Sequence, residues 1–419
     1  MLDIKFPKDF LWGSSTSSHQ VEGNANNQWT KWEQENAEKL SLDASNDLEW
    51  LPNWKDIANN ATDPKNYLSG NGIEHYARYK DDFKFLKKLG MNAFRFSFEW
   101  SRLQPSEGQW DKDVLRHYHD YIAELRTLNI EPIVTLFHWT LPTWFTDQGG
   151  FAKKDNIKYF VNYANKVIEE FGEDISYLIT LNEPNVYTAF GYLTGTWPPQ
   201  TKNIITAYKV YRNLISTHNR TYKVIKKQAP RIRIGIAAQL ADVRALHKFN
   251  PINSVVIKLY AYFANWWFLD KIKNNSDFIG LNYYFTEYRN WRGKTVNPKS
   301  PLSDLGWYME PSGIYPLIST VWNRYKKTII ITENGLADAE DSKREWWLEE
   351  TLQALQKALT DGIDLKGYLY WSLFDNFEWA YGWWPRFGLI AINRQSMERT
   401  IRPSAIKLSE MIRTLTSAK

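Results

Sequence analysis

Short apolar runs alternate with helical patterns along the whole chain, and this alternation predicts a parallel α/β fold. The apolar runs are rich in β-branched and large aliphatic residues, as at 328–331, which is typical of buried parallel strands. Between the runs, apolar residues recur at spacings of three and four. The segment 73–90 shows this helical spacing at Tyr76, Tyr79, Phe83, Leu86 and Leu89, followed by a stop signal at Gly90.

The pattern predicts eight strands, at residues 10–17, 92–100, 132–139, 177–183, 231–238, 277–284, 328–333 and 365–373. Helices are predicted near residues 73–90, 112–128, 155–171, 203–228, 256–272, 312–325 and 343–361. The polar, Trp-containing stretch that ends near Gly72 interrupts the alternation, and we expect it to be an insertion over the rim of the sheet.

The strand count favours a closed (β/α)8 TIM barrel with rim insertions over an open doubly wound sheet. No Gly-rich phosphate loop follows the first predicted strand, which also speaks against a dinucleotide-binding fold. The chain contains no internal repeat, no Pro-rich or Gly/Ser-rich linker and no low-complexity segment. We therefore expect one catalytic barrel domain over residues 1–419.

Two of the predicted strands end in a glutamate. Glu183 follows the apolar run that begins at Tyr177, and Glu333 follows the run that begins at Thr328. Taken singly, each acid could simply form an ion pair at the end of a strand. Since parallel strands present their carboxyl ends at one rim, the two acids together predict a facing pair, which is what cleavage of a glycosidic bond requires.

Composition narrows the classes of partner. Aromatic residues make up 16% of the chain and include 21 Trp, which suggests surfaces for stacking sugars. The net charge of +5 is small for 419 residues and no long Lys/Arg run occurs, which argues against nucleic acid. Cys is absent, so neither disulfides nor thiolate metal sites can form. No leader-like or membrane-spanning apolar stretch is found, and the simplest expectation is a soluble, cytoplasmic protein.

Motifs at the strand ends add a resemblance to a known family. They are Thr180-Leu181-Asn182-Glu183-Pro184, Ile331-Thr332-Glu333-Asn334-Gly335, Phe137-His138-Trp139, Asp375-Asn376-Phe377-Glu378-Trp379 and Arg386-Phe387-Gly388-Leu389, together with Gln20. In this order they resemble the family 1 glycoside hydrolases, the β-glucosidase family, over residues 6–402. The resemblance implies a (β/α)8 barrel and a retaining exo-β-glycosidase that needs no metal or other cofactor.

The resemblance also assigns roles to individual residues. It implies that Glu183 is the acid/base and Glu333 the nucleophile, with Arg95 and Tyr284 holding the nucleophile as an anion. Asn182 matches the residue that bonds the sugar 2-hydroxyl, although an Asn at this position could also cap a turn. The remaining matches to substrate-binding positions are Gln20, His138, Trp139, Glu378, Trp379 and Phe387, with Trp371 as a stacking floor and Trp307 on the aglycone side.

The sequence departs from the family pattern in three places. Only six residues, 271–276, connect the segment ending at Asp270 to the sixth strand, where the family has a few dozen. We therefore expect Phe263, Trp266, Trp267 and Phe278 to lose part of their cover. The segment 30–72 is longer and more polar than usual, and Trp383 and Trp384 stand where small or polar residues are common, so the aglycone preference stays open.

Three other functions compete with hydrolysis of small O-linked β-glucosides. A phospho-β-glycosidase would carry Ser where Glu378 stands, because a carboxylate repels phosphate. A thioglucosidase would carry Gln in place of Glu183. A sugar-binding barrel without turnover would need neither acid. The sequence does not choose among glucose, galactose and fucose as the glycone, and it is silent on assembly.

Overall fold

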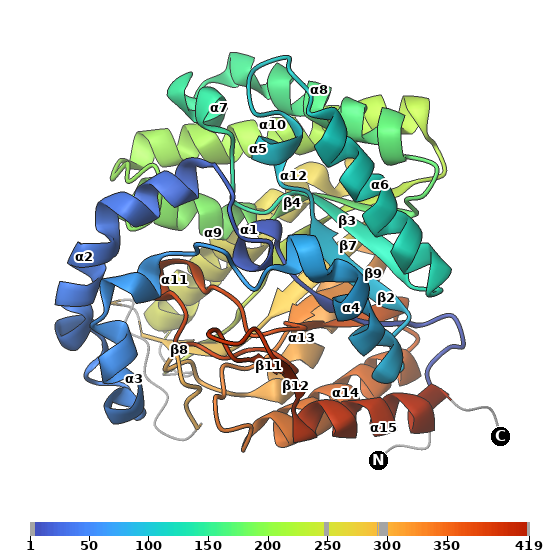
Figure 1. The fold of residues 1–419 in the computed structure, drawn as a ribbon. Helices are drawn as coiled ribbons and strands as arrows, with labels where there is room; N and C mark the ends of the chain where they lie inside the picture. Colours follow the sequence, from blue (N-terminus) through green and yellow to red (C-terminus); the bar gives the residue numbers. More distant parts are fainter. Residues whose placement is uncertain (1–4, 247–250, 291, 293–300, 417–419) are drawn as a thin grey trace.

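The computed structural model describes residues 5–246, 251–290, 292 and 301–416 (Figure 1). Its centre is a barrel of eight parallel strands. They are β1 (Leu11–Ser15), β2 (Ala93–Ser97), β3 (Glu131–Phe137), β4 (Tyr177–Asn182), β5 (Arg233–Gln239), β7 (Phe278–Tyr283), β9 (Thr328–Asn334) and β10 (Leu365–Trp371). Each coincides with one of the predicted strands, and only the strand ends differ.

The barrel closes because its first and last strands pair. The order around it is β1-β10-β9-β7-β5-β4-β3-β2, and β1 meets β10 in parallel register from Leu11 opposite Gly367 to Ser15 opposite Trp371. The interior is filled by a buried cluster with members from every barrel strand: Leu11, Ala93, Ile133, Tyr177, Ile179, Ala237, Phe278, Ile330 and Leu369. The predicted (β/α)8 fold is confirmed.

The outer layer consists of helices that surround the barrel (Figure 1). They are α4 (His75–Lys88), α6 (Lys112–Thr127), α8 (Ile157–Phe171), α10 (Ile204–Gln228), α11 (Pro251–Ala261), α12 (Trp267–Ile272), α13 (Ile314–Tyr325), α14 (Arg344–Thr360) and α15 (Pro403–Thr416). In α8, buried residues recur at three and four positions, as at Phe160, Tyr163, Ala164 and Val167, which is the spacing of one helical face. Helix α15 had not been predicted.

Short elements cover the rim where the strands end. They are α1 (Ser18–Val21), α2 (Gln28–Leu48), α3 (Trp54–Ala61), α5 (Trp100–Leu103), α7 (Thr143–Asp147), α9 (Pro184–Thr188), and two small sheets formed by β6 (Asp242–Ala245) with β8 (Thr286–Arg289) and by β11 (Ile390–Ile392) with β12 (Arg399–Ile401). Sequence patterning predicted an insertion before Gly72 but not its helices. Helix α2 is polar on most sides and buries a narrow face at Trp29, Trp32, Ala37, Ser41 and Ala44, after a capping box at Asn27.

The side chains next to the short connection at 271–276 are more buried than the sequence suggested. Phe278 is completely buried because its side chain points into the barrel interior, so the expectation that it loses cover was wrong. Trp267 is half-buried and stacks on Tyr211 with ring centroids 5.1 Å apart. Trp266 is half-buried beneath the guanidinium of Arg324. Phe263, by contrast, is 58% exposed, as expected.

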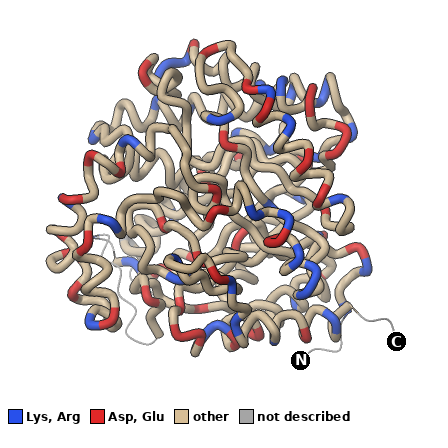
Figure 2. The backbone as a smooth tube through the Cα atoms, in the orientation of Figure 1, with Lys and Arg blue, Asp and Glu red and all other residues tan. Residues whose placement is uncertain are grey.

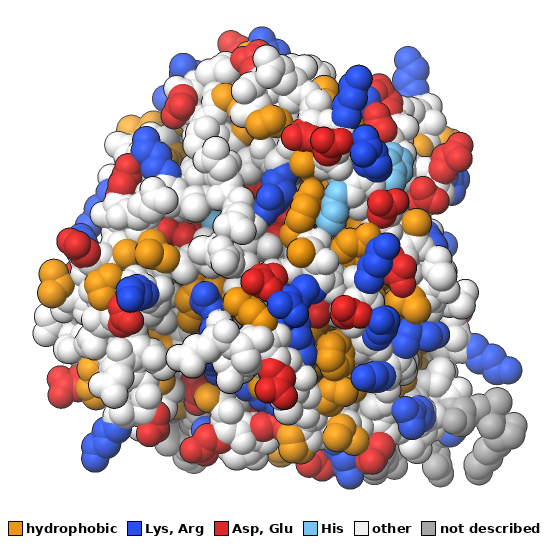
Figure 3. All heavy atoms as spheres, viewed as in Figure 1, with side chains coloured by type: hydrophobic (Ala, Val, Ile, Leu, Met, Phe, Trp, Pro, Cys, Tyr) orange, Lys and Arg blue, Asp and Glu red, His pale blue; other side chains and the backbone are white. Residues whose placement is uncertain are grey.

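Charges of both signs are distributed over the molecule. Lys and Arg alternate with Asp and Glu along the backbone (Figure 2), and the face in Figure 3 shows both signs interspersed with apolar side chains. No broad basic surface is visible on that face. Within the described ranges, none of the helices combines the length and apolar character that crossing a bilayer demands.

Candidate active site

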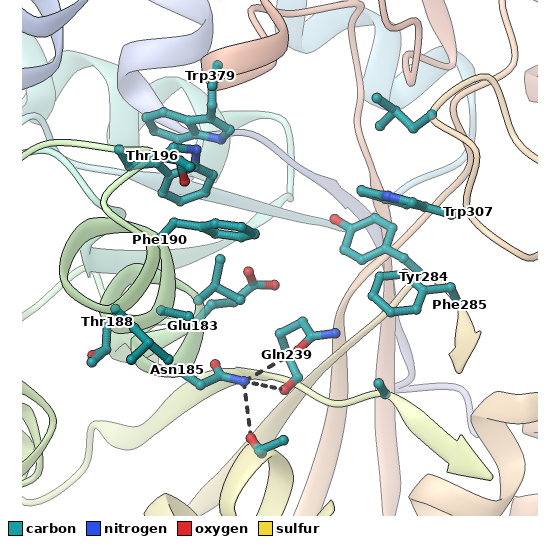
Figure 4. Close-up of a pocket in the computed structure, with 18 of the residues that line it drawn as sticks. Glu183, Asn185, Thr188, Phe190, Thr196, Gln239, Tyr284, Phe285, Trp307 and Trp379 are labelled. Carbon is teal, nitrogen blue, oxygen red and sulfur yellow. Dashed lines mark hydrogen bonds between the residues drawn. The ribbon is translucent and has the colours of Figure 1, made fainter. Parts of the chain in front are cut away.

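A cavity of about 1180 Å³ opens at the carboxyl ends of the barrel strands (Figure 4). Most of the predicted site residues line it: His138, Trp139, Glu183, Tyr284, Trp307, Glu333, Trp371, Glu378, Trp379 and Phe387. Arg95, Asn182 and Gln20 are fully buried just behind these residues. Trp383 and Trp384 are buried and lie outside the lining, so their effect on the aglycone side is at most indirect.

Glu183 is held in an unusual backbone conformation directly after β4. Its φ of 44° and ψ of 60° are left-handed, although a residue before proline normally avoids helical angles. Its N–H donates to the carbonyl of Ala237 on β5 at 2.7 Å, and Pro184 begins α9. Trp139 and Trp379 also have positive φ, 71° and 52°. Three residues that line the cavity thus occupy conformations that persist only where the surrounding structure enforces them.

Glu333, near the end of β9, receives two strong hydrogen bonds. The guanidinium of Arg95 donates to its Oε1 at 2.5 Å, and the hydroxyl of Tyr284 donates to its Oε2 at 2.6 Å. Burial raises the pKa of Tyr284 well above its ordinary value, and the negative charge of Glu333 raises it further, so the phenol keeps its proton. Both carboxylate oxygens of Glu333 therefore face donors, which favours its ionised form.

Asn282 contacts Glu183 and was missed as a site residue in the sequence. It is fully buried on β7, and its amide donates to Oε1 of Glu183 at 2.7 Å. The nearby amide also makes a small contribution that lowers the pKa of Glu333. The signal that could have revealed it is the one that revealed Glu183: a polar side chain at the carboxyl end of an apolar strand.

The two glutamates differ in how strongly they hold a proton. Burial raises the pKa of Glu183 well above its usual value, and the nearby charge of Glu333 raises it further. Burial also raises the pKa of Glu333, but the charge of Arg95 and the hydrogen bond from Tyr284 oppose this effect. Glu333 therefore ionises first, and Glu183 keeps its proton. Burial and the charge of Glu333 raise the pKa of Glu378 to about 8.

A hydrogen-bonded chain behind the cavity orients His138. Arg95 can only donate, and its Nη2 donates to Oδ1 of Asn182 at 2.7 Å, so the Asn182 amide nitrogen must face His138. That nitrogen lies 3.1 Å from Nε2 of His138, which makes Nε2 the acceptor and puts the ring proton on Nδ1. Burial, and secondarily the charge of Arg95, lowers the pKa of His138 well below its usual range, so the ring is neutral.

The remaining polar and aromatic groups form the walls of the same cavity. The amide of Gln20 donates to the carbonyl of Phe377 at 2.7 Å and to Oε2 of Glu378 at 3.3 Å, which positions that carboxyl group. The rings of His138 and Trp371 lie stacked with centroids 5.7 Å apart. Tyr284, Trp307 and Phe387 form a cluster of rings with centroid separations of 5.6 to 6.1 Å, and Trp371 belongs to the same buried cluster.

A pair of buried acids between aromatic walls can bind a sugar and exchange protons with it. Figure 4 shows the carboxyl group of Glu183 facing Tyr284 across the cavity, with Trp307 and Phe285 on the Tyr284 side and Phe190 and Trp379 on the other. Flat rings suit the apolar faces of a sugar, and carboxyl and amide groups suit its hydroxyls. The arrangement provides one proton donor and one anion in a cavity lined largely by aromatic rings.

Comparison with known proteins places the chain in a family. The sequence profile of the family described as "Glycosyl hydrolase family 1" matches residues 2–273 and 269–416, two segments that overlap at residues 269–273, where the short connection begins. A 1,4-beta-D-glucan glucohydrolase of Thermotoga neapolitana is 30% identical, and the alignment covers 98% of each protein. Beta-glucosidase A of Acetivibrio thermocellus is 30% identical, with 99% of each protein covered.

A solved structure resembles the whole molecule as well. The beta-glycosidase from Pyrococcus horikoshii superimposes with a TM-score of 0.87 and is 33% identical in sequence. The match covers 98% of this chain and 96% of that one. The sequence motifs, the barrel and these relatives agree: this chain belongs to glycosyl hydrolase family 1 and is a glycoside hydrolase of the β-glucosidase type.

Proposed function

We propose that this enzyme removes the terminal β-D-glucosyl residue from the non-reducing end of small O-glycosides and retains the configuration at the anomeric carbon. The observation that carries the proposal is the contrast between two buried carboxyl groups in one cavity: Glu333 accepts hydrogen bonds from Arg95 and Tyr284 on both oxygens, whereas burial and the charge of Glu333 keep Glu183 protonated. Retention requires a carboxyl separation of about 5 to 5.5 Å, at which Glu333 attacks directly, whereas inversion uses ~6.5 to 9.5 Å, which leaves room for water. The names of the β-glucosidase relatives support glucose as the glycone.

The first step forms a covalent intermediate. The Glu333 carboxylate attacks the anomeric carbon while the bond from that carbon to the glycosidic oxygen breaks. Glu183 gives its proton to the departing oxygen, so the aglycone leaves as a neutral alcohol. Arg95 and Tyr284 hold the nucleophile in place through both of its oxygens before the attack.

In the second step, Glu183 acts as a base instead of an acid. Once Glu333 is esterified, its negative charge is gone, and one of the two causes that raise the pKa of Glu183 disappears with it. Glu183, now a carboxylate, removes a proton from water, and the water oxygen attacks the anomeric carbon. The bond to Glu333 breaks and restores its carboxylate. Two displacements on the same carbon give net retention.

A panel of nitrophenyl α- and β-glycosides tests the proposal. We expect hydrolysis of the β-glucoside, and the β-galactoside and β-fucoside test the competing glycones. NMR spectra taken early in the reaction should show the β-anomer as the first sugar product. An α-anomeric first product would overturn the retaining mechanism. A preference for α-glycosides would overturn the proposed role of the two glutamates altogether.

The dependence of kcat/KM on pH should be bell-shaped. Below the pKa of Glu333 the nucleophile is protonated, and above the pKa of Glu183 the acid has lost its proton. Because burial and the charge of Glu333 raise the pKa of Glu183, the alkaline limb should lie well above the ~4.3 of a free glutamate. Rates measured from about pH 4 to 9 check this, and both limbs report the coupled pair. A flat profile contradicts the pairing.

A further inference from the structure

Two arginines outside the cavity carry guanidinium atoms that have no hydrogen-bond partner. Among the described residues, Nη1 of Arg386 and Nε of Arg394 are both buried and meet no acceptor. A buried N–H without an acceptor is unfavourable, and a charged one more so, because the water that it has lost is not replaced. Neither arginine belongs to the lining of the cavity, although Phe387, which follows Arg386, does. These two groups therefore need acceptors from another source.

The two arginines lie close together at the end of β11. Oδ2 of Asp375 accepts from the N–H of Ile392, the last residue of β11, at 3.4 Å and lies 3.9 Å from Nη1 of Arg386. Arg394 follows Ile392 by two residues, in the turn between β11 and β12. Burial, and next the charge of Arg386, lowers the pKa of Arg394 to about 10, so the two positive charges act on each other.

Asp375 does not neutralise this pair of arginines. Arg402 donates to both carboxylate oxygens of Asp375 at 3.1 Å, and the N–H of Gly388 donates to Oδ1 at 3.0 Å. At 3.9 Å, Nη1 of Arg386 is too far from Asp375 for a hydrogen bond. Arg394 has no ion pair among the residues that the structure describes. The pair thus keeps an excess of positive charge.

Trp383 holds Arg394 in place. The central carbon of the guanidinium lies 3.3 Å from the centroid of the Trp383 ring. The ring is buried, and its Nε1 donates to the carbonyl of Leu68 at 2.9 Å. Stacking occupies one face of a guanidinium and leaves its N–H groups, which lie in the guanidinium plane, available to a ligand. Trp383, which departs from the family pattern, therefore orients a cation.

The chemistry of the two groups selects the class of ligand. Both arginines are reachable from solvent, because 25% of the Arg386 side chain is exposed and Arg394 is half-buried. Guanidinium groups only donate hydrogen bonds, so the missing partner must be an acceptor, and two positive charges favour an anion. Two guanidinium groups suit the several oxygens and the double negative charge of a phosphate group better than the single charge of a carboxylate.

We propose that Arg386 and Arg394 form a binding site for a phosphate-type oxyanion, outside the cavity that contains Glu183. The anion accepts hydrogen bonds from Nη1 of Arg386 and from Nε of Arg394 and neutralises both charges. Inorganic phosphate and a phosphate monoester present the same oxygens, so the chemistry is shared and the experiment separates the two sources. The site is independent of the proposed β-glucosidase function.

Thermal unfolding in rising concentrations of inorganic phosphate, with chloride used to keep the ionic strength constant, tests the site. The Tm should rise saturably, by about 1 to 2 °C at ten times the Kd. An equal rise with methyl phosphate would assign the site to phosphate monoesters as well, and a rise with inorganic phosphate alone would assign it to the free anion. The absence of a saturable rise with inorganic phosphate, or an equal rise with acetate, would overturn the proposal.

Variants of Arg394 locate the bound anion. Arg394→Gln should weaken phosphate binding about 10- to 150-fold, because a charge-assisted hydrogen bond is lost. Arg394→Lys keeps the charge but not the fork, and its affinity should lie between those of the parent and the Gln variant. If Arg394→Gln lowers the Tm but responds to phosphate as the parent does, Arg394 has only a structural role and the proposal falls.

Arg324→Gln is the matched control. The guanidinium of Arg324 also lies over a Trp ring, 5.5 Å from the centroid of Trp266, but its Nη2 donates to both oxygens of Asp270 at 2.9 and 2.8 Å. Because this arginine already has its carboxylate, its replacement should leave the response to phosphate unchanged. An equal loss of the response in the Arg324 and Arg394 variants would contradict the assigned position of the anion.

Activity assays separate this site from the cavity. Saturating phosphate should change kcat/KM for nitrophenyl β-glucoside less than twofold, because neither arginine lines the cavity. Competitive inhibition by phosphate that persists in Arg394→Gln would place the anion in the cavity and overturn the assignment. The unfolding experiment needs no turnover, so the site stands or falls separately from the proposed β-glucosidase function.

Discussion

The Glu333→Ala variant is expected to hydrolyse β-glucosides about 10⁴-fold or more slowly than the parent enzyme, because no covalent intermediate can form without the carboxylate. The loss should fall on kcat and on kcat/KM alike, since the first displacement is removed for every substrate. Steady-state assays with nitrophenyl β-glucoside, supported by circular dichroism to show an intact fold, provide the measurement. Turnover close to that of the parent would show that Glu333 is not the nucleophile.

Glu131 offers a matched control for this variant. It is also a glutamate on a barrel strand paired with an arginine, because Arg126 donates to both of its carboxylate oxygens at 2.6 and 3.1 Å. It lies at the opposite end of the barrel, at the start of β3. Glu131→Ala should therefore leave kcat/KM within a few-fold of the parent value. If kcat/KM falls to a similar extent in both variants, the cause is a disturbed barrel and not the loss of the nucleophile.

The Glu183→Gln variant should separate substrates by the leaving group they carry. Hydrolysis of alkyl glucosides, whose departing oxygen needs a proton, should slow by about 10² to 10⁴-fold in kcat/KM. The kcat/KM for dinitrophenyl glucoside should change little, because that group leaves without a proton. The alkaline limb of the pH profile should also disappear, since it reports the titration of Glu183.

Azide provides the control for the second step in this variant. It is an anion that needs no general base, so it should restore kcat with dinitrophenyl glucoside and yield a β-glucosyl azide. If kcat/KM falls equally for alkyl and dinitrophenyl glucosides, Glu183 is not the acid. Absence of azide rescue would exclude it as the base of the second step.

The barrel was predictable from sequence because its strands are buried on both faces. Runs such as Ile329 to Ile331 are apolar without interruption, which sets them apart from the helices between them. The helices at the rim were harder to predict from the sequence. Helix α2 buries only a narrow face, and its polar residues resemble those of a loop. The burial of Phe278 was predicted wrongly because the short connection at 271–276 was expected to expose the neighbouring side chains. Side chains alternate between the two faces of a strand, and the ring of Phe278 points into the barrel.

The meeting of Glu183 and Glu333 in one cavity was predictable because each glutamate follows a long apolar run. Asn282 sits in the same position on β7, but a neutral amide gives no sign of its function until its neighbours are known. The left-handed backbone of Glu183, which bonds to Ala237, and the position of Phe263 in the cavity wall depend on segments that are distant in sequence. Such features follow from tertiary packing, which local patterns do not encode.

The buried acids that share one cavity also make the free energy of unfolding depend on pH. The pKa of Glu378 is about 8 in the folded enzyme, whereas an unfolded chain holds a glutamate near ~4.3. Between these pH values the folded protein keeps a proton that the unfolded chain has released, so unfolding releases protons and rising pH favours it. Glu183 and Glu333 act in the same direction. The ligand-free enzyme therefore gives up thermodynamic stability as the pH approaches the range in which Glu333 is ionised, and the packed barrel offsets that loss.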